Sequence, residues 1–71
     1  MQDVFINKEP VELYKVLKFE GLVATGGEAK MVVADGMVSV NGEVEMRKRC
    51  KLKAGDVVEF DNQQYRLVLT Q

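Results

Sequence analysis

The chain contains no histidine, one cysteine and one proline, and these shortages exclude several classes of function. Without histidine, a nucleophile motif, a His/Cys metal spacing or a phosphate-binding glycine fingerprint, we expect no enzyme activity, no metal site and no cofactor. Cys50 has no second cysteine with which to form an intrachain disulfide, which is ordinary in a reducing compartment. We expect Cys50 to be a small packing residue. The sequence therefore favours a binding role.

Long apolar runs are also missing. No stretch approaches the ~20 residues that a membrane helix needs, and the start MQDVFINKEP has neither the basic nor the apolar region of a secretory signal. We therefore expect a cytoplasmic protein. With 71 residues, of which 46% are hydrophobic, the chain is near the lower size at which one core supports folding. We expect one domain over residues 1–71.

The formal net charge of −1 conceals an uneven distribution of charge. Residues 46–53 contain five cations and no acid, whereas the rest of the chain has five cations against eleven acids. We call residues 47–53 the basic segment; its cations are Arg47, Lys48, Arg49, Lys51 and Lys53. Polarised charge of this kind steers a polyanionic partner to one face of a protein.

The first third of the chain predicts a strand and then a helix. Residues 3–6 have the β-branched and aromatic bias of a short strand, and residues 7–10 indicate a helix start with proline in the first turn. Apolar residues then recur with helical spacing, which predicts one buried stripe. The stripe consists of Leu13, Val16 and Leu17. Gly21 is expected in the left-handed position that follows the helix.

A second helix is predicted to begin after Thr25. Thr25 and Glu28 have the spacing of a capping box, in which the Thr hydroxyl accepts from the Glu28 amide and the carboxylate reaches back to the Thr25 amide. Gly36 is expected to end this helix. Its predicted buried face consists of Ala29, Val32 and Val33. Because few residues join the two helices, they should pack as a pair.

From residue 37 the apolar period changes to two, which indicates strands. Asn41-Gly42 predicts a type I′ hairpin, and the return strand should end near Met46, leaving the basic segment as an irregular connection. Further strands are expected at residues 57–60 and 65–69, after turns at residues 54–56 and 61–64. A strand, two helices and then several strands make an α+β fold.

These elements and their residues resemble the RNA-binding domain first named from the fourth small-subunit ribosomal protein. The matching segments are Leu13-Tyr-Lys-Val-Leu17, Gly21-Leu22, Glu28-Ala29 through Gly36, Val38-Ser-Val-Asn-Gly-Glu43 and Lys53-Ala-Gly-Asp-Val-Val58. They span roughly residues 11–60. The resemblance implies the alpha-L motif, in which two short packed helices are followed by a small twisted antiparallel sheet. Gly-Gly-Glu-Ala-Lys at 26–30 and Arg-Lys-Arg-Cys-Lys at 47–51 look like the small stand-alone bacterial branch, often labelled YbcJ-like.

The resemblance further implies a module that binds structured RNA of the rRNA or tRNA class, and RNA phosphates favour Arg and Lys. The expected primary contacts are Lys15, Lys30, Arg47, Lys48, Arg49, Lys51 and Lys53. The expected secondary contacts are Tyr14, Lys18, Gly26, Gly27 and Asn41. Where relatives usually carry cations near and along the helices, this chain has Glu12, Gly26 and Gly27. The basic segment therefore carries most of the prediction, with Arg47 and Arg49 as its best single candidates.

Plainer structural roles compete with these functional ones. A charge run alone often only solvates a turn, the Gly26-Gly27 pair suits a helix cap, and Asn41 suits a hairpin turn. Tyr14 suits the edge of the core. The other aromatic residues are expected in the core, so RNA would be recognised by shape and backbone more than by base stacking; they are Phe5, Phe19, Phe60 and Tyr65.

The alternative function is a protein-interaction adaptor, in which the basic segment docks on an acidic or ribosome-associated partner. An enzyme is the least supported class, because carboxylates and lysines would have to run the reaction and no pair of them is distinctively spaced. We expect the chain to be a monomer.

Overall fold

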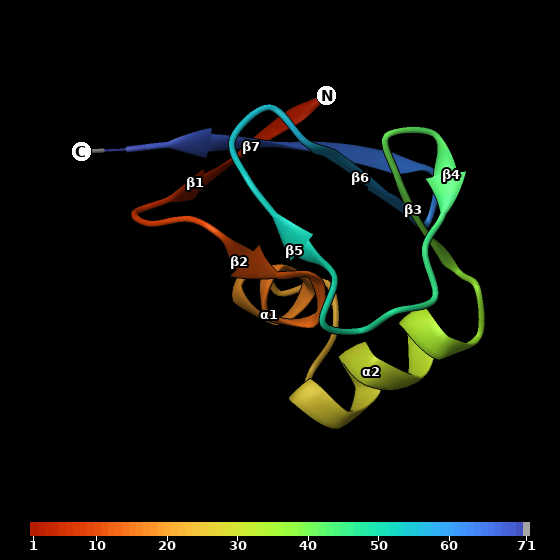
Figure 1. The fold of residues 1–71 in the computed structure, drawn as a ribbon. Helices are drawn as coiled ribbons and strands as arrows, with labels where there is room; N and C mark the ends of the chain where they lie inside the picture. The colour runs from red at the N-terminus through yellow and green to blue at the C-terminus, as the bar shows by residue number, and fades with distance from the viewer. Residues whose placement is uncertain (71) are drawn as a thin grey trace.

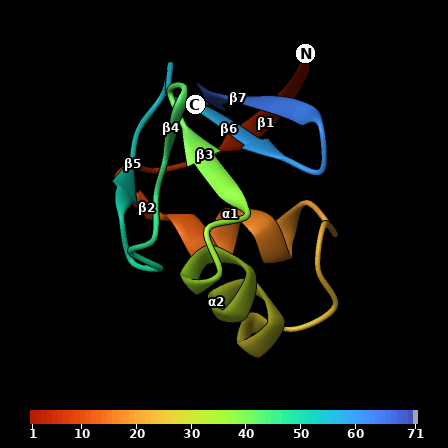
Figure 2. The ribbon, with the colours of Figure 1, turned by 90° about the vertical axis from the view of Figure 1, so that its right-hand side faces the viewer.

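The computed structural model describes residues 1–70 and consists of two helices packed on one side of a sheet (Figure 1). The elements follow one another as β1 (Gln2–Ile6), β2 (Val11–Glu12), α1 (Leu13–Phe19), α2 (Gly26–Ala34), β3 (Val38–Val40), β4 (Glu43–Val44), β5 (Lys51–Leu52), β6 (Val57–Phe60) and β7 (Gln63–Leu69). Figure 2, turned by 90°, again shows both helices on the same side of the sheet. The predicted α+β class and the helix pair are confirmed.

The main sheet has the strand order β1-β7-β6-β3-β4, and it is mixed where an antiparallel sheet was expected. Its later strands pair antiparallel, but β1 runs parallel to β7, with Val4 opposite Leu67. Two parallel neighbours need a long crossover connection. Here the helix pair and all the other strands form that connection. The first strand therefore pairs with the last strand of the chain, β7.

A second, two-stranded sheet pairs β2 with β5 and changes two expectations. First, α1 begins at Leu13 and not within residues 7–10, because residues 11 and 12 are extended and pair with β5. Second, the basic segment is not irregular throughout, since Lys51 and Leu52 form β5. Figures 1 and 2 both show this strand pair beside α1.

The second helix begins where the capping pattern predicted. The Thr25 hydroxyl accepts a 3.1 Å hydrogen bond from the Glu28 amide, and the helix ends ahead of Gly36, whose φ is +76°. One detail of the prediction is wrong: the Glu28 carboxylate accepts from the amide of Ala24, at 2.8 Å, and not from that of Thr25. The Glu28 side chain therefore binds the amide of the residue that precedes the N-cap residue Thr25.

The core lies between the helices and the sheet. It contains both predicted helix stripes together with strand residues from the two sheets. Its buried side chains are Val4, Ile6, Leu13, Val16, Leu17, Val23, Ala29, Val32, Val33, Val38, Leu52, Val58, Tyr65 and Leu67. Phe60 packs against them, but the expectation of a core position is wrong for Phe5 and Phe19, which are 66% and 68% exposed. Phe5 alternates with buried Val4 and Ile6, so it faces away from the core.

The hairpin prediction at Asn41-Gly42 is confirmed, since these residues join β3 to β4 with φ values of 53° and 89°. The Asn41 side chain donates to Asp56 Oδ1 at 3.1 Å and accepts from the Val57 amide at 2.9 Å. It thereby holds the turn before β6 against the hairpin. The last turn is tighter than expected, because β7 already begins at Gln63. Neither helix within residues 1–70 is long and apolar enough to cross a membrane.

Candidate nucleic-acid interface

The basic segment is fixed by its backbone to the start of α1. The Leu13 amide donates to the Cys50 carbonyl at 2.9 Å, and the Tyr14 amide donates to the Lys48 carbonyl at 3.1 Å. The first amides of a helix have no partner within the helix, and α1 has no side-chain cap at Glu12. The carbonyls of the basic segment supply the missing acceptors. These two hydrogen bonds hold the basic segment against the start of α1.

Three cations from two distant parts of the chain meet at one carboxylate. Glu12 lies 3.2 Å from Lys15, 3.6 Å from Lys51 and 4.0 Å from Arg49, measured between the nearest nitrogen and oxygen atoms. We call these four residues the Glu12 cluster. The hydrogen bond from Lys15, followed by the charges of Lys51 and Arg49, lowers the pKa of Glu12 against the opposing effect of burial. One carboxylate cannot neutralise three cations, so the cluster is positive.

The Glu12 cluster forms because β2 and β5 pair in one particular register. Glu12 is opposite Lys51 across the strand pair, and Lys15 follows Glu12 by three residues, at the start of α1. Side chains alternate along β5, so Leu52 is buried while Lys51 is exposed. The cations keep 46–67% of their side-chain surface exposed, whereas Glu12 keeps 18%. An approaching anion therefore meets the cations before the carboxylate.

Tyr14 extends this surface from α1 to α2. The ammonium of Lys30 lies 5.0 Å from the centroid of the Tyr14 ring, and that of Lys15 lies 6.0 Å from it. Both distances allow a cation–π attraction. Lys15 and Lys30, predicted as the two helix contacts, therefore flank the same ring.

Arg47 is held separately by Glu45. Its guanidinium donates to both carboxylate oxygens, at 2.9 and 3.2 Å, and its amide donates to one of them at 3.0 Å. These bonds lower the pKa of Glu45 to about 2 and raise that of Arg47. Burial, followed by the Glu45 charge, raises the pKa of Cys50, which is half-buried against the core as expected of a packing residue. Arg47 itself stays 79% exposed, with part of its charge offset.

Comparison with known proteins places this chain in a family. The S4 domain matches residues 4–68. The chain belongs to the S4 domain family. YbcJ of Escherichia coli (strain K12) is 50% identical over 56 residues, which cover 78% of this chain and 80% of YbcJ. RlbA of Bacillus subtilis (strain 168), named a probable ribosome maturation protein, is 36% identical over 58 residues and 82% of each chain.

A tyrosine–tRNA ligase of Bordetella pertussis (strain Tohama I) is 38% identical over 58 residues, but these make up only 14% of that enzyme. The likeness to the ligase is therefore a likeness to its S4 domain.

Two solved structures share the fold of this S4 domain. The solution structure of E. coli YbcJ superposes with a TM-score of 0.72 at 42% identity, covering 96% of this chain and 87% of YbcJ, and is described as revealing an alfaL motif involved in RNA-binding. The 30S ribosomal protein S4e of Thermoplasma acidophilum superposes with a TM-score of 0.74 at 26% identity, over 90% of this chain and 34% of S4e. The expected family, its YbcJ-like branch and the alpha-L motif are thus confirmed.

The remaining predicted contacts of this S4 domain share no side-chain hydrogen bond or ion pair with the Glu12 cluster within residues 1–70, and all of them except the half-buried Gly26 are exposed. The Lys48 carbonyl binds α1 while its side chain is exposed, and the Lys53 amide donates to Asp56 at 2.9 Å. Lys18 is in the last turn of α1. Gly26 and Gly27 open α2 beside the Thr25 cap, and Asn41 holds a turn as described above, so these three positions have a clear structural role. As RNA contacts, all six stay predictions.

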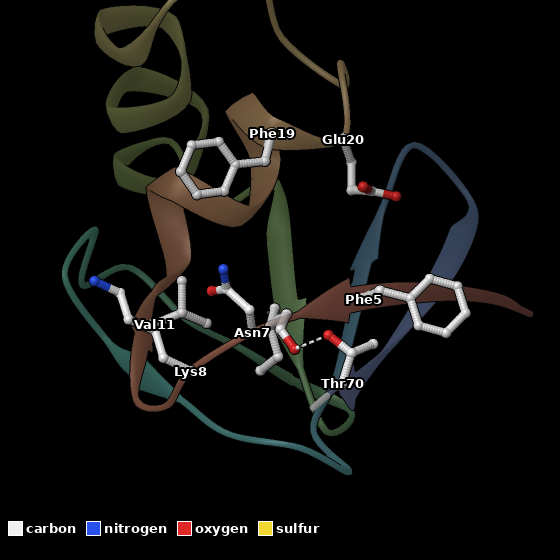
Figure 3. Close-up of a pocket in the computed structure, with 8 residues that line it drawn as sticks. Phe5, Asn7, Lys8, Val11, Phe19, Glu20 and Thr70 are labelled. Carbon is white, nitrogen blue, oxygen red and sulfur yellow. Dashed lines mark hydrogen bonds between the residues drawn. The ribbon is translucent and has the colours of Figure 1, made fainter.

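The sequence analysis missed a second feature, a hollow of about 520 Å³ beside β1 and the end of α1. Figure 3 shows the residues that line this hollow, with Phe19 above Asn7 and Phe5 to the right of it. A smaller hollow of about 240 Å³ shares Lys8, Val11 and Phe19 with it. We call the larger one the Phe5–Phe19 groove. Its signals were present in the sequence, since Phe5 alternates with inward residues and Phe19 lies off the buried stripe of α1.

Proposed function

We propose that this S4 domain is a non-catalytic module that binds structured RNA of the rRNA or tRNA class. The observation that carries the proposal is the convergence of Lys15, Arg49 and Lys51 on the single carboxylate of Glu12. The three cations come from α1 and the basic segment, and hydrogen bonds join the two backbones. They form a positive surface that is in place before a partner arrives.

The chemistry of the surface suits phosphate. Arg49 offers a planar fork that can donate two hydrogen bonds to one phosphate, while Lys15 and Lys51 supply compact charges. Arg47 and Lys48 continue the surface along the basic segment, and binding would release condensed counterions from the RNA. Contacts of this type fix position on a backbone and do not read sequence. They fit an RNA that is recognised by its folded shape.

The relatives support RNA as the partner. The YbcJ structure is described as containing a motif involved in RNA-binding. RlbA is named for ribosome maturation, S4e is a protein of the 30S subunit, and the ligase acts on tRNA by its name. These proteins differ in their activities but share this domain. RNA binding is the simplest function that fits both these relatives and the geometry of the Glu12 cluster. We propose that the protein performs it as a monomer in the cytoplasm.

Nuclease treatment tests the class of partner. The tagged protein is cross-linked in cells, purified with and without RNase, and the bound RNA is sequenced. We expect enriched rRNA or tRNA fragments, and co-purifying proteins that disappear after RNase. The control is a protein with both Arg49→Gln and Lys51→Gln, which should recover little RNA. A protein partner that survives RNase, together with no enriched RNA, would replace this proposal with the adaptor function.

A further inference from the structure

We propose that the Phe5–Phe19 groove receives an unpaired base of the RNA that the Glu12 cluster holds. This inference rests on the proposed function and adds a second mode of contact to it. The starting observation is that two phenylalanine rings, 66% and 68% exposed, line one hollow. Apolar rings of this size are normally covered, and an exposed pair around a concave site marks a place where something binds.

The chemistry of the lining suits a nucleobase. Aromatic faces stack on bases of any sequence. Between and beside the rings are polar groups that can meet the edge of a base: the amide of Asn7, the carboxylate of Glu20 and the hydroxyl of Thr70. Thr70 is fixed in place, because its amide and hydroxyl both donate to the Ile6 carbonyl, at 2.7 and 3.2 Å. The dashed line at Thr70 in Figure 3 is the bond that the hydroxyl donates.

The groove continues into the proposed phosphate-binding surface. Lys8 and Phe19 line both the groove and the smaller hollow, and the smaller hollow is also lined by Glu12, Lys15 and Lys51. A strand whose phosphates lie on the Glu12 cluster would therefore pass Lys8 as it leaves the cluster. Lys8 supplies a cation at this junction. The continuity of the two hollows, and the positive charge of Lys8 and the Glu12 cluster, favour an RNA base over an apolar protein segment as the occupant.

The two phenylalanine rings do not contribute to the buried core. Phe5 is on the outer side of β1 and Phe19 is the last residue of α1, and neither belongs to the buried core. Truncating them should therefore change binding without unfolding the chain. This makes the inference testable by substitution.

The test compares two RNA probes of equal length and equal phosphate number, a hairpin with a ten-nucleotide unpaired loop and a fully paired duplex. A protein with both Phe5→Ala and Phe19→Ala should bind the hairpin roughly 5- to 150-fold more weakly per stacked base lost, which is the usual effect of removing one stacking ring. Its affinity for the duplex should not change. Met37→Ala serves as a matched control, since Met37 is 56% exposed and does not line the groove.

The outcomes separate this inference from the proposed function. If the double phenylalanine variant binds the hairpin as tightly as the wild type, while Arg49→Gln with Lys51→Gln weakens binding, the groove inference is wrong and RNA binding by the cluster stands. If the wild type binds neither probe, both are wrong. Upfield shifts of the Phe5 and Phe19 ring signals on addition of the hairpin, measured by NMR, would support stacking directly, and unchanged ring signals would refute it.

Discussion

Replacing Arg49 and Lys51 by glutamine should weaken RNA binding by an amount that depends strongly on salt. Each phosphate that a cation neutralises contributes about −0.7 to −0.9 to the slope of log affinity against log salt. Both side chains are about two-thirds exposed beside Glu12, so each is free to engage one phosphate. Removing both should make the slope shallower by about 1.4 to 1.8. If the variant and the wild type bind equally at about 1 M salt, the variant should lose RNA affinity roughly 15- to 30-fold at about 0.15 M salt and roughly 70- to 220-fold at about 0.05 M.

The assay is fluorescence anisotropy of labelled bulk tRNA titrated with protein over this range of salt. The matched control is Arg66→Gln, which also removes one cation but lies on β7, where Arg66 pairs with Asp3 at 3.2 Å. A single Arg49→Gln substitution should reduce the slope by about 0.7 to 0.9, while the control should leave it nearly unchanged. Thermal unfolding of each variant checks that the fold is intact.

Two results would refute the reasoning. If the control and the Arg49 variant lost the same affinity, total charge and not the Glu12 cluster would determine binding. If affinity fell without any change in slope, the two cations would act through the conformation of the basic segment and not through phosphate contacts. Either result would remove the Glu12 cluster from the proposed interface.

Three further predictions concern single side chains. Glu12→Gln should raise RNA affinity roughly two- to fivefold at low salt, because it removes a carboxylate that competes with phosphate for three cations; weaker binding in the same anisotropy assay would contradict this. The pairing of Glu45 with Arg47 holds the Glu45 pKa at about 2, below its usual 4.5, so its small stabilising effect should be complete above about pH 4.5 and vanish as the pH falls towards 2. Thermal melts of wild type and Glu45→Gln should converge at low pH, and a constant gap would exclude this linkage. Leu17→Ala should cost about 2–5 kcal/mol in urea unfolding, because Leu17 is fully buried, whereas Met37→Ala should cost little.

The sequence predicted those parts of the fold that depend on near neighbours. The Thr25 cap, the glycine that follows each helix and the Asn41-Gly42 hairpin are all encoded within a few residues, and all are present. The parallel pairing of β1 was not predictable in this way, because its partner strand is some sixty residues away. The β2–β5 pair was missed because each strand has only two residues, too few to show an alternating pattern.

The candidate site was predictable in composition but not in geometry. The basic segment and Lys15 are evident from the sequence, but nothing local places Glu12 against Arg49 and Lys51 across the β2–β5 pair. From the sequence, Glu12 was only a position where relatives carry a cation. In the structure it lies within 4.0 Å of three cations. The exposure of Phe5 could have been inferred from strand alternation, had aromatic character not been taken as a sign of burial.

At the start of α1, RNA would have to be bound by side chains and not by backbone amides. A free helix N-terminus attracts phosphate through its unpaired amides. Here the amides of Leu13 and Tyr14 already donate to the Cys50 and Lys48 carbonyls. The same bonds turn these carbonyls towards the helix, and they fix the backbone from which Arg49 and Lys51 project. Because that backbone is already ordered, binding would immobilise side chains only, which lowers the entropic cost of association.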